Sequence, residues 1–93
     1  MGLFGTDITK ALNQNDLQLA EMAIIFAKYH GDSLSGAVAD ELRSKIQNKK
    51  SFSKSEIRTL AKCVRYMVSR NGQDVQIDNV KEALDLAGRI EKL

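Results

Sequence analysis

The segment F-S-K-S-E-I, residues 52–57, decides the fold because it holds the clearest helix start in the chain. Ser53 is a favoured N-cap residue, and Glu56 stands three residues later, where its carboxylate can reach back to the cap. Phe52 and Ile57 occupy the two positions that contact each other in a hydrophobic staple. Beyond this start, apolar residues recur at helical spacing, and they are Ile57, Leu60, Ala61, Val64, Met67 and Val68. The segment therefore predicts a helix that begins after Ser53 and ends near Asn71-Gly72.

Similar signals on either side predict a short helix over residues 7–13 and longer helices over 15–30 and 36–48. Gly31 is expected to end the helix 15–30 in the left-handed conformation. A last helix begins after Asp78 or Asn79 and contains Gly88, which we expect to mark the close approach of a neighbouring helix.

No segment alternates apolar and polar residues for long enough to predict a strand. The expected fold class is all-α, a small bundle of four main helices plus a short N-terminal helix. Residues 1–93 are expected to form a single helical domain, because a chain of this length supports one modest core.

The composition excludes several kinds of site. One cysteine, Cys63, cannot form an intrachain disulfide, and together with one histidine, His30, it cannot supply an ordinary zinc site. The six glycines form no phosphate-binding loop. No apolar run approaches the roughly 18 residues that a membrane span needs. We therefore expect a cytoplasmic protein without a metal or cofactor.

No catalytic group emerges either. His30 stands in the last turn of a predicted helix, where a positive charge is favoured, and no nucleophile accompanies it. Cys63 borders the apolar side of its helix and is expected to be a small, partly buried residue. The carboxylates are interpreted as helix caps and surface groups, and Asp85 is expected to pair with Arg89. The chain is therefore predicted not to be an enzyme.

The first six residues match the loose myristoylation pattern M-G-x-x-x-[ST], in which Gly2 would carry the lipid. The alternative is a frayed start whose residues Leu3 and Phe4 fold onto the core.

The charges are distributed unevenly along the chain. Residues 43–70 hold nine basic residues and one acidic residue, whereas residues 1–42 hold two basic and six acidic residues. We define as the basic face the cations on one side of the predicted helix and in the turn before it: Lys49, Lys50, Lys54, Arg58, Lys62 and Arg65. The four cations within the helix fall in an arc of about 80° at about 100° per residue.

This basic face has three interpretations. It can bind an acidic protein surface, follow a nucleic-acid backbone, or be a solvated surface whose charges pair loosely with acidic helices of the same chain. Phe52 and Tyr66 lie near the cations and could stack on bases, but a staple and an edge-of-core ring explain them better.

The helix 15–30 carries a second apolar stripe outside its main apolar side. Met22, Ile25 and Tyr29 form this stripe together with Gln18, and we call these four residues the outer stripe. The outer stripe is expected either to be buried within the monomer, to form a homodimer, or to bind another partner.

These features favour a non-enzymatic interaction or regulatory module, an adaptor or inhibitor, that docks an acidic protein partner through the basic face. The alternative is a dimeric nucleic-acid-binding protein that contacts phosphates through the same residues.

Overall fold

The computed structural model describes residues 5–31 and 34–93, and these residues form five helices and no strand. The helices are α1 (Ile8–Ala11), α2 (Gln14–His30), α3 (Gly36–Gln47), α4 (Lys54–Ser69) and α5 (Val80–Glu91). The predicted all-α class, with four main helices and a short leading one, is confirmed. The lipidation pattern around Gly2 and the apolar pair Leu3 and Phe4 lie outside the described residues.

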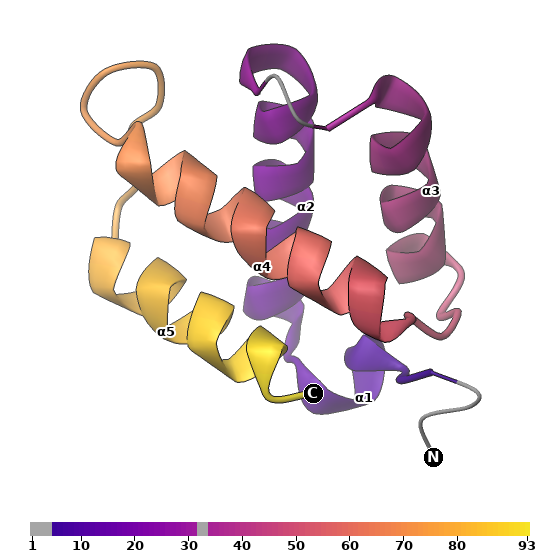
Figure 1. Ribbon diagram of the computed structural model, residues 1–93. Coiled ribbons are helices and arrows are strands. Elements are labelled where there is room, and N and C mark those ends of the chain that lie inside the picture. Colours follow the sequence, from indigo (N-terminus) through magenta and orange to yellow (C-terminus); the bar gives the residue numbers. More distant parts are fainter. Residues whose placement is uncertain (1–4, 32–33) are drawn as a thin grey trace.

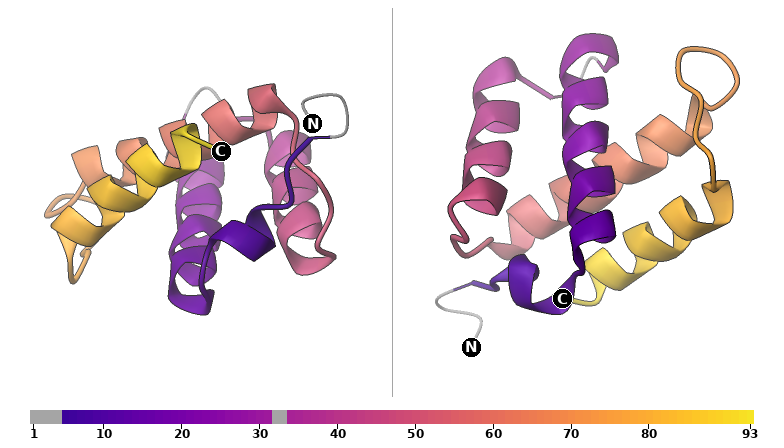
Figure 2. Two further views of the ribbon diagram at one scale, coloured as in Figure 1. Left: turned by 90° about the horizontal axis from the view of Figure 1, so that it is seen from below. Right: turned by 180° about the vertical axis from the view of Figure 1, so that it is seen from behind.

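The helices form two crossed antiparallel pairs. In Figure 1, α2 and α3 stand side by side, and α4 and α5 run together across them. Helix α4 packs against both α5 and α2, and α2 also packs against α3. Figure 2 shows from two further sides that α4 and α5 cover one side of α2. Consequently α4 has one side in the core and one side available to solvent.

The core draws on all of these elements. Its largest fully buried side chains are Phe52, Ile8, Ile24, Leu42, Leu60, Met67, Leu86, Ile90 and Val64. Phe52 lies just before α4 and exchanges two backbone hydrogen bonds with Thr6, at 2.9 and 2.7 Å. This bridge holds the start of the chain against the start of α4. Ile57 is buried as well, as the hydrophobic staple predicts.

Capping residues fix where the two longest helices begin. The predicted capping box of α4 is present: the Glu56 amide donates to Ser53 Oγ at 3.2 Å, and the Ser53 amide donates to Glu56 Oε1 at 2.8 Å. The predicted start of α2 at Asn15 is wrong. Asn13 is the N-cap, and its own capping box is completed by Asp16.

Two expectations about glycines are also wrong. Gly31 caps α2 with a φ of −94°, so it is not left-handed. It is nevertheless constrained, because a Cβ there would lie 2.8 Å from the Ala27 carbonyl oxygen. Gly88 has open space where a Cβ would project, with nothing within 4 Å, so no neighbouring helix explains it.

Among the described helices, none combines the length and the apolar character that crossing a bilayer requires.

Candidate interaction surface

The basic face is assembled from one helix and the turn that precedes it. Its six cations are all exposed. Four of them lie along α4, beside the side of the helix that buries Ile57, Leu60, Ala61, Val64 and Met67. The structure therefore places the four cations of α4 along one exposed side of that helix, whereas Lys49 lines a hollow with Asp7 and Lys10.

The two lysines of the turn are exposed because of how α3 ends. Lys49 adopts the left-handed conformation with a φ of 55°. The Lys50 amide then donates to the Lys45 carbonyl at 2.9 Å, and the Lys49 amide donates to the Ile46 carbonyl at 3.4 Å. These two bonds form a Schellman motif, which closes a helix and redirects the chain. The motif turns Lys49 and Lys50 away from the core.

Most cations of the basic face have no acidic partner. Arg65 forms an ion pair with Glu91 of α5. Among the described residues, no carboxylate lies within ion-pair distance of the other five. By contrast, Lys45 is bound by Glu56 at 2.6 Å, and Arg70 is bound by Asp74. Of the nine cations in residues 43–70, those without an ion-pair partner among the described residues are therefore five of the basic face and Arg43 of α3.

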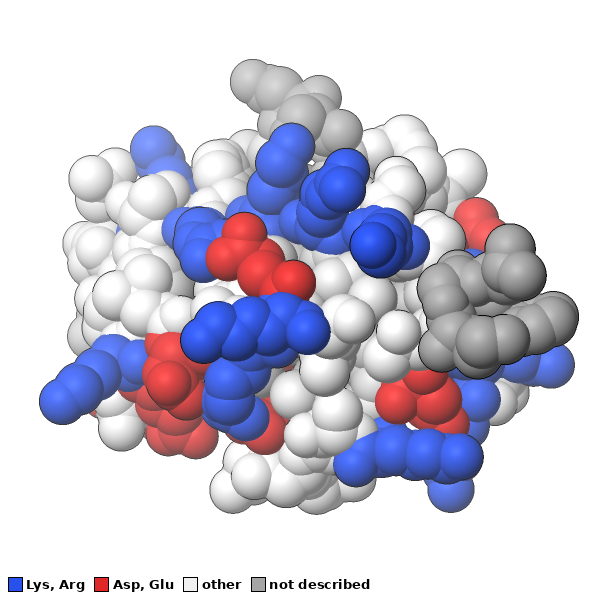
Figure 3. Space-filling model, turned by 60° about the horizontal axis from the view of Figure 1, so that its bottom comes forward, with Lys and Arg blue, Asp and Glu red and all other residues white. Residues whose placement is uncertain are grey.

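The surface is nevertheless mixed in charge. Figure 3 shows basic side chains gathered on this side of the molecule with acidic side chains among them. The hydrogen bond from Arg65 lowers the pKa of Glu91, and the pKa of Arg65 is raised in return. Glu91 therefore stays ionised beside the cations. A ligand of this surface meets one fixed negative charge as well as several positive charges.

A shallow groove of about 250 Å³ adjoins the N-terminal half of α4. It is lined by Lys54, Ile57 and Arg58 of α4 and by Glu91, Lys92 and Leu93 at the end of α5. Lys92 is a further cation of this region that the sequence did not reveal. It comes next to α4 through packing of α5, and no local pattern signals that contact.

The two aromatic residues near the cations are not available for stacking on bases. Phe52 is fully buried. Tyr66 is half-buried, its hydroxyl donates to the His30 carbonyl at 2.7 Å, and its ring packs on Phe26. Both rings therefore act within the fold.

Cys63 and His30, the two residues considered for catalysis, both make packing contacts within the fold. Cys63 is buried, and burial raises the pKa of its thiol to about 11. The ring of His30 stacks on Phe26 with the ring centroids 4.5 Å apart. Within residues 5–31 and 34–93, no three His, Cys, Asp or Glu side chains are grouped so that they could hold a metal ion.

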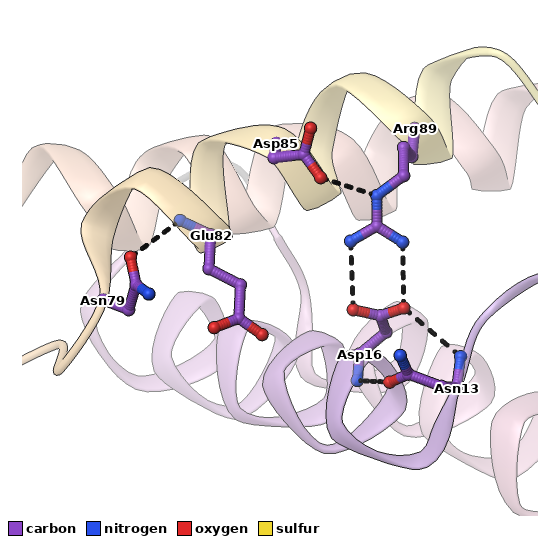
Figure 4. Close-up of polar contacts among 6 residues, drawn as sticks. All are labelled: Asn13, Asp16, Asn79, Glu82, Asp85 and Arg89. Carbon is purple, nitrogen blue, oxygen red and sulfur yellow. Dashed lines mark hydrogen bonds and ion pairs between the residues drawn. The ribbon is translucent and has the colours of Figure 1, made fainter.

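The only buried charged residue among those described is Asp16, which is 3% exposed. Its two carboxylate oxygens accept hydrogen bonds from Arg89 at 2.9 and 3.0 Å, and Arg89 Nε donates to Asp85 at 2.8 Å (Figure 4). The predicted Asp85–Arg89 pair is thus confirmed. The hydrogen bonds from Arg89 lower the pKa of Asp16. With its oxygens occupied by Arg89 and Asn13, Asp16 serves the fold and leaves no free group for a ligand.

The outer stripe of α2 is not buried by the part of the chain that the structure describes. Met22, Ile25 and Tyr29 are 41%, 37% and 72% exposed. In the right view of Figure 2, no other helix passes in front of α2. Of the three explanations for this stripe, burial within the monomer is therefore wrong as far as residues 5–31 and 34–93 are concerned.

Comparisons of the chain with protein-family models, with curated proteins and with solved structures found no match. The chemistry of the two surfaces is therefore the basis for assigning a function.

Proposed function

We propose that this chain is a non-enzymatic interaction module, an adaptor or inhibitor, that binds an acidic protein partner through the basic face. One observation carries the proposal. Four exposed cations, Lys50 before α4 and Lys54, Arg58 and Lys62 along it, have no ion-pair partner among the described carboxylates, whereas Lys49 lies near Asp7. Such a cluster attracts anionic partners over a distance and accelerates their association.

The mixed charge of the surface favours a protein over a nucleic acid. Glu91 is ionised and neutralises Arg65, so a phosphate backbone that followed α4 to its end would meet no net positive charge there. A protein surface can place a lysine or an arginine opposite Glu91 and carboxylates opposite the cations. The groove places Lys92 and Leu93 beside Lys54 and Arg58, so it offers both charged and apolar contacts to the side chains of a protein partner.

Nucleic acid is the second candidate, with the protein acting as a dimer. The spacing along α4 favours it, because Lys54, Arg58 and Lys62 follow one another at about 6 Å intervals along one side of the helix. A duplex is the form to expect, since neither Phe52 nor Tyr66 can stack on the bases of a single strand.

Two labelled probes separate the candidates. Fluorescence anisotropy of poly-L-glutamate and of a short generic DNA duplex is measured at about 20 mM and about 150 mM salt. The proposal predicts binding to poly-L-glutamate that is tighter than binding to the duplex and that weakens with salt. Tighter binding of the duplex favours the second candidate. No binding of either probe at the lower salt concentration overturns both.

A further inference from the structure

The outer stripe of α2 has the spacing of a helix–helix seam. Gln18, Met22, Ile25 and Tyr29 follow one another at intervals of four, three and four residues. This is the alternation by which one helix packs along another in a coiled coil. The opposite side of α2, with Ala20, Ala23, Ile24 and Ala27, is buried against the rest of the chain. The helix thus presents two packing sides, and the described residues occupy one of them.

We propose that a second copy of this chain occupies the other side, with the two α2 helices packed antiparallel about a twofold axis. Met22 of each copy then lies against Ile25 of the other, and Tyr29 lies over Gln18. An isologous contact of this kind needs one self-complementary surface and closes at two subunits.

The charges beside the outer stripe favour a second copy of this chain as the partner. They also favour an antiparallel arrangement of the two α2 helices. Glu21 and Lys28 lie along the same edge of the outer stripe. They are seven residues apart, so they occupy equivalent positions of consecutive heptads. Antiparallel pairing places Glu21 of each copy near Lys28 of the other. Parallel pairing would instead place Glu21 on the Leu19 side of the second α2, where Asp78 and Glu82 line a hollow with Leu19 and Met22 and would repel it.

Neighbouring residues hold both charges at this edge. Lys28 donates to Asp40 of α3 at 3.0 Å, and Glu21 accepts from Gln47 of α3 at 3.4 Å. The hydrogen bond from Lys28 to Asp40 raises the pKa of Lys28, so the lysine stays charged. In the dimer each Lys28 lies between Asp40 of its own chain and Glu21 of the second copy.

The contact is small. A stable interface buries about 800 Å² on each partner, and three partly exposed side chains supply much less. We therefore expect a reversible dimer with a dissociation constant between about 10 µM and about 1 mM. The α4 and α5 pair covers the other side of α2 (Figure 2), so both basic faces remain free in the dimer.

Sedimentation velocity between about 10 µM and about 1 mM tests the proposal. The wild type is expected to shift from monomer to dimer over this range, and Ile25→Asp is expected to remain monomeric. Leu84→Asp is the matched control, because Leu84 is a 49% exposed apolar residue of α5 outside the seam. It should leave the association unchanged. A wild type that stays monomeric, or an Ile25→Asp variant that still associates, overturns the proposal.

A charge exchange tests the direction of the helices. It is made in an Asp40→Asn background, so that reversing Lys28 does not place two carboxylates together in one chain. Glu21→Lys and Lys28→Glu should each raise the dissociation constant about three- to ten-fold, and the combination should restore it. Failure of the combined variant to recover overturns the antiparallel arrangement. Circular dichroism of each variant establishes that the helices are intact.

Discussion

Arg89 of α5 and Asp16 of α2 are 73 residues apart in the chain, and their side chains form two parallel hydrogen bonds of 2.9 and 3.0 Å (Figure 4). Asp16 also completes the capping box at the start of α2. One buried carboxylate therefore starts the longest described helix and fastens the last turn of α5 to it. Since α5 packs on α4, this contact supports the helix that carries the basic face.

Replacement of Asp16 should destabilise the fold. Asp16→Asn keeps the size of the side chain but removes its charge, leaving Arg89 with a weaker acceptor. We expect a loss of about 2 kcal/mol in the free energy of unfolding, measured with urea. Asp85→Asn is the control, because Asp85 also binds Arg89 but its side chain is 67% exposed. Its cost should stay below about 0.5 kcal/mol. Equal losses in the two variants would show that burial of Asp16 is unimportant.

Stability should also fall in acid through the same carboxylate. The hydrogen bonds from Arg89 lower the pKa of Asp16 below its ordinary value of 3.8. A lowered pKa in the folded state gives stability that is present above the ordinary value and is lost as the pH falls through the lowered one. Unfolding free energies between about pH 6 and about pH 2 should therefore decrease less in Asp16→Asn than in the wild type. Parallel curves for the two proteins would contradict the assignment.

The thiol of Cys63 should be unreactive in the native protein. With a pKa of about 11, only about 0.1% of it is thiolate at pH 8. Burial adds a steric barrier. Reaction with a thiol reagent such as Ellman's reagent should be slow in buffer and become fast once urea unfolds the chain. Rapid labelling of the folded protein would show that the side chain is accessible.

Local signals predicted much of this structure from the sequence. The capping box of Ser53 and Glu56 is confined to four residues, so it could be recognised without knowing the rest of the fold. The spacing of Lys54, Arg58 and Lys62 determined their position on α4 for the same reason.

Contacts between distant segments could not be predicted in this way. The start of α2 does have a local signal, because Asn13 and Asp16 complete a capping box within four residues. The pairing of Asp16 with Arg89, 73 residues away, depends instead on how α5 packs. The ion pair of Arg65 with Glu91 likewise depends on how α5 packs on α4. Whether the outer stripe of α2 is covered also depends on the packing of whole helices.

Binding of labelled poly-L-glutamate by a pair of matched double variants tests the central claim most directly. Arg58→Ala combined with Lys62→Ala removes two cations from the basic face, and Lys10→Ala combined with Lys81→Ala removes two exposed cations from α1 and α5. The net charge changes equally in the two variants. We predict that the first variant binds about ten-fold more weakly than the wild type and that the second stays within about two-fold. Equal weakening in both would mean that overall charge, and not the basic face, binds the acidic partner, which contradicts the account.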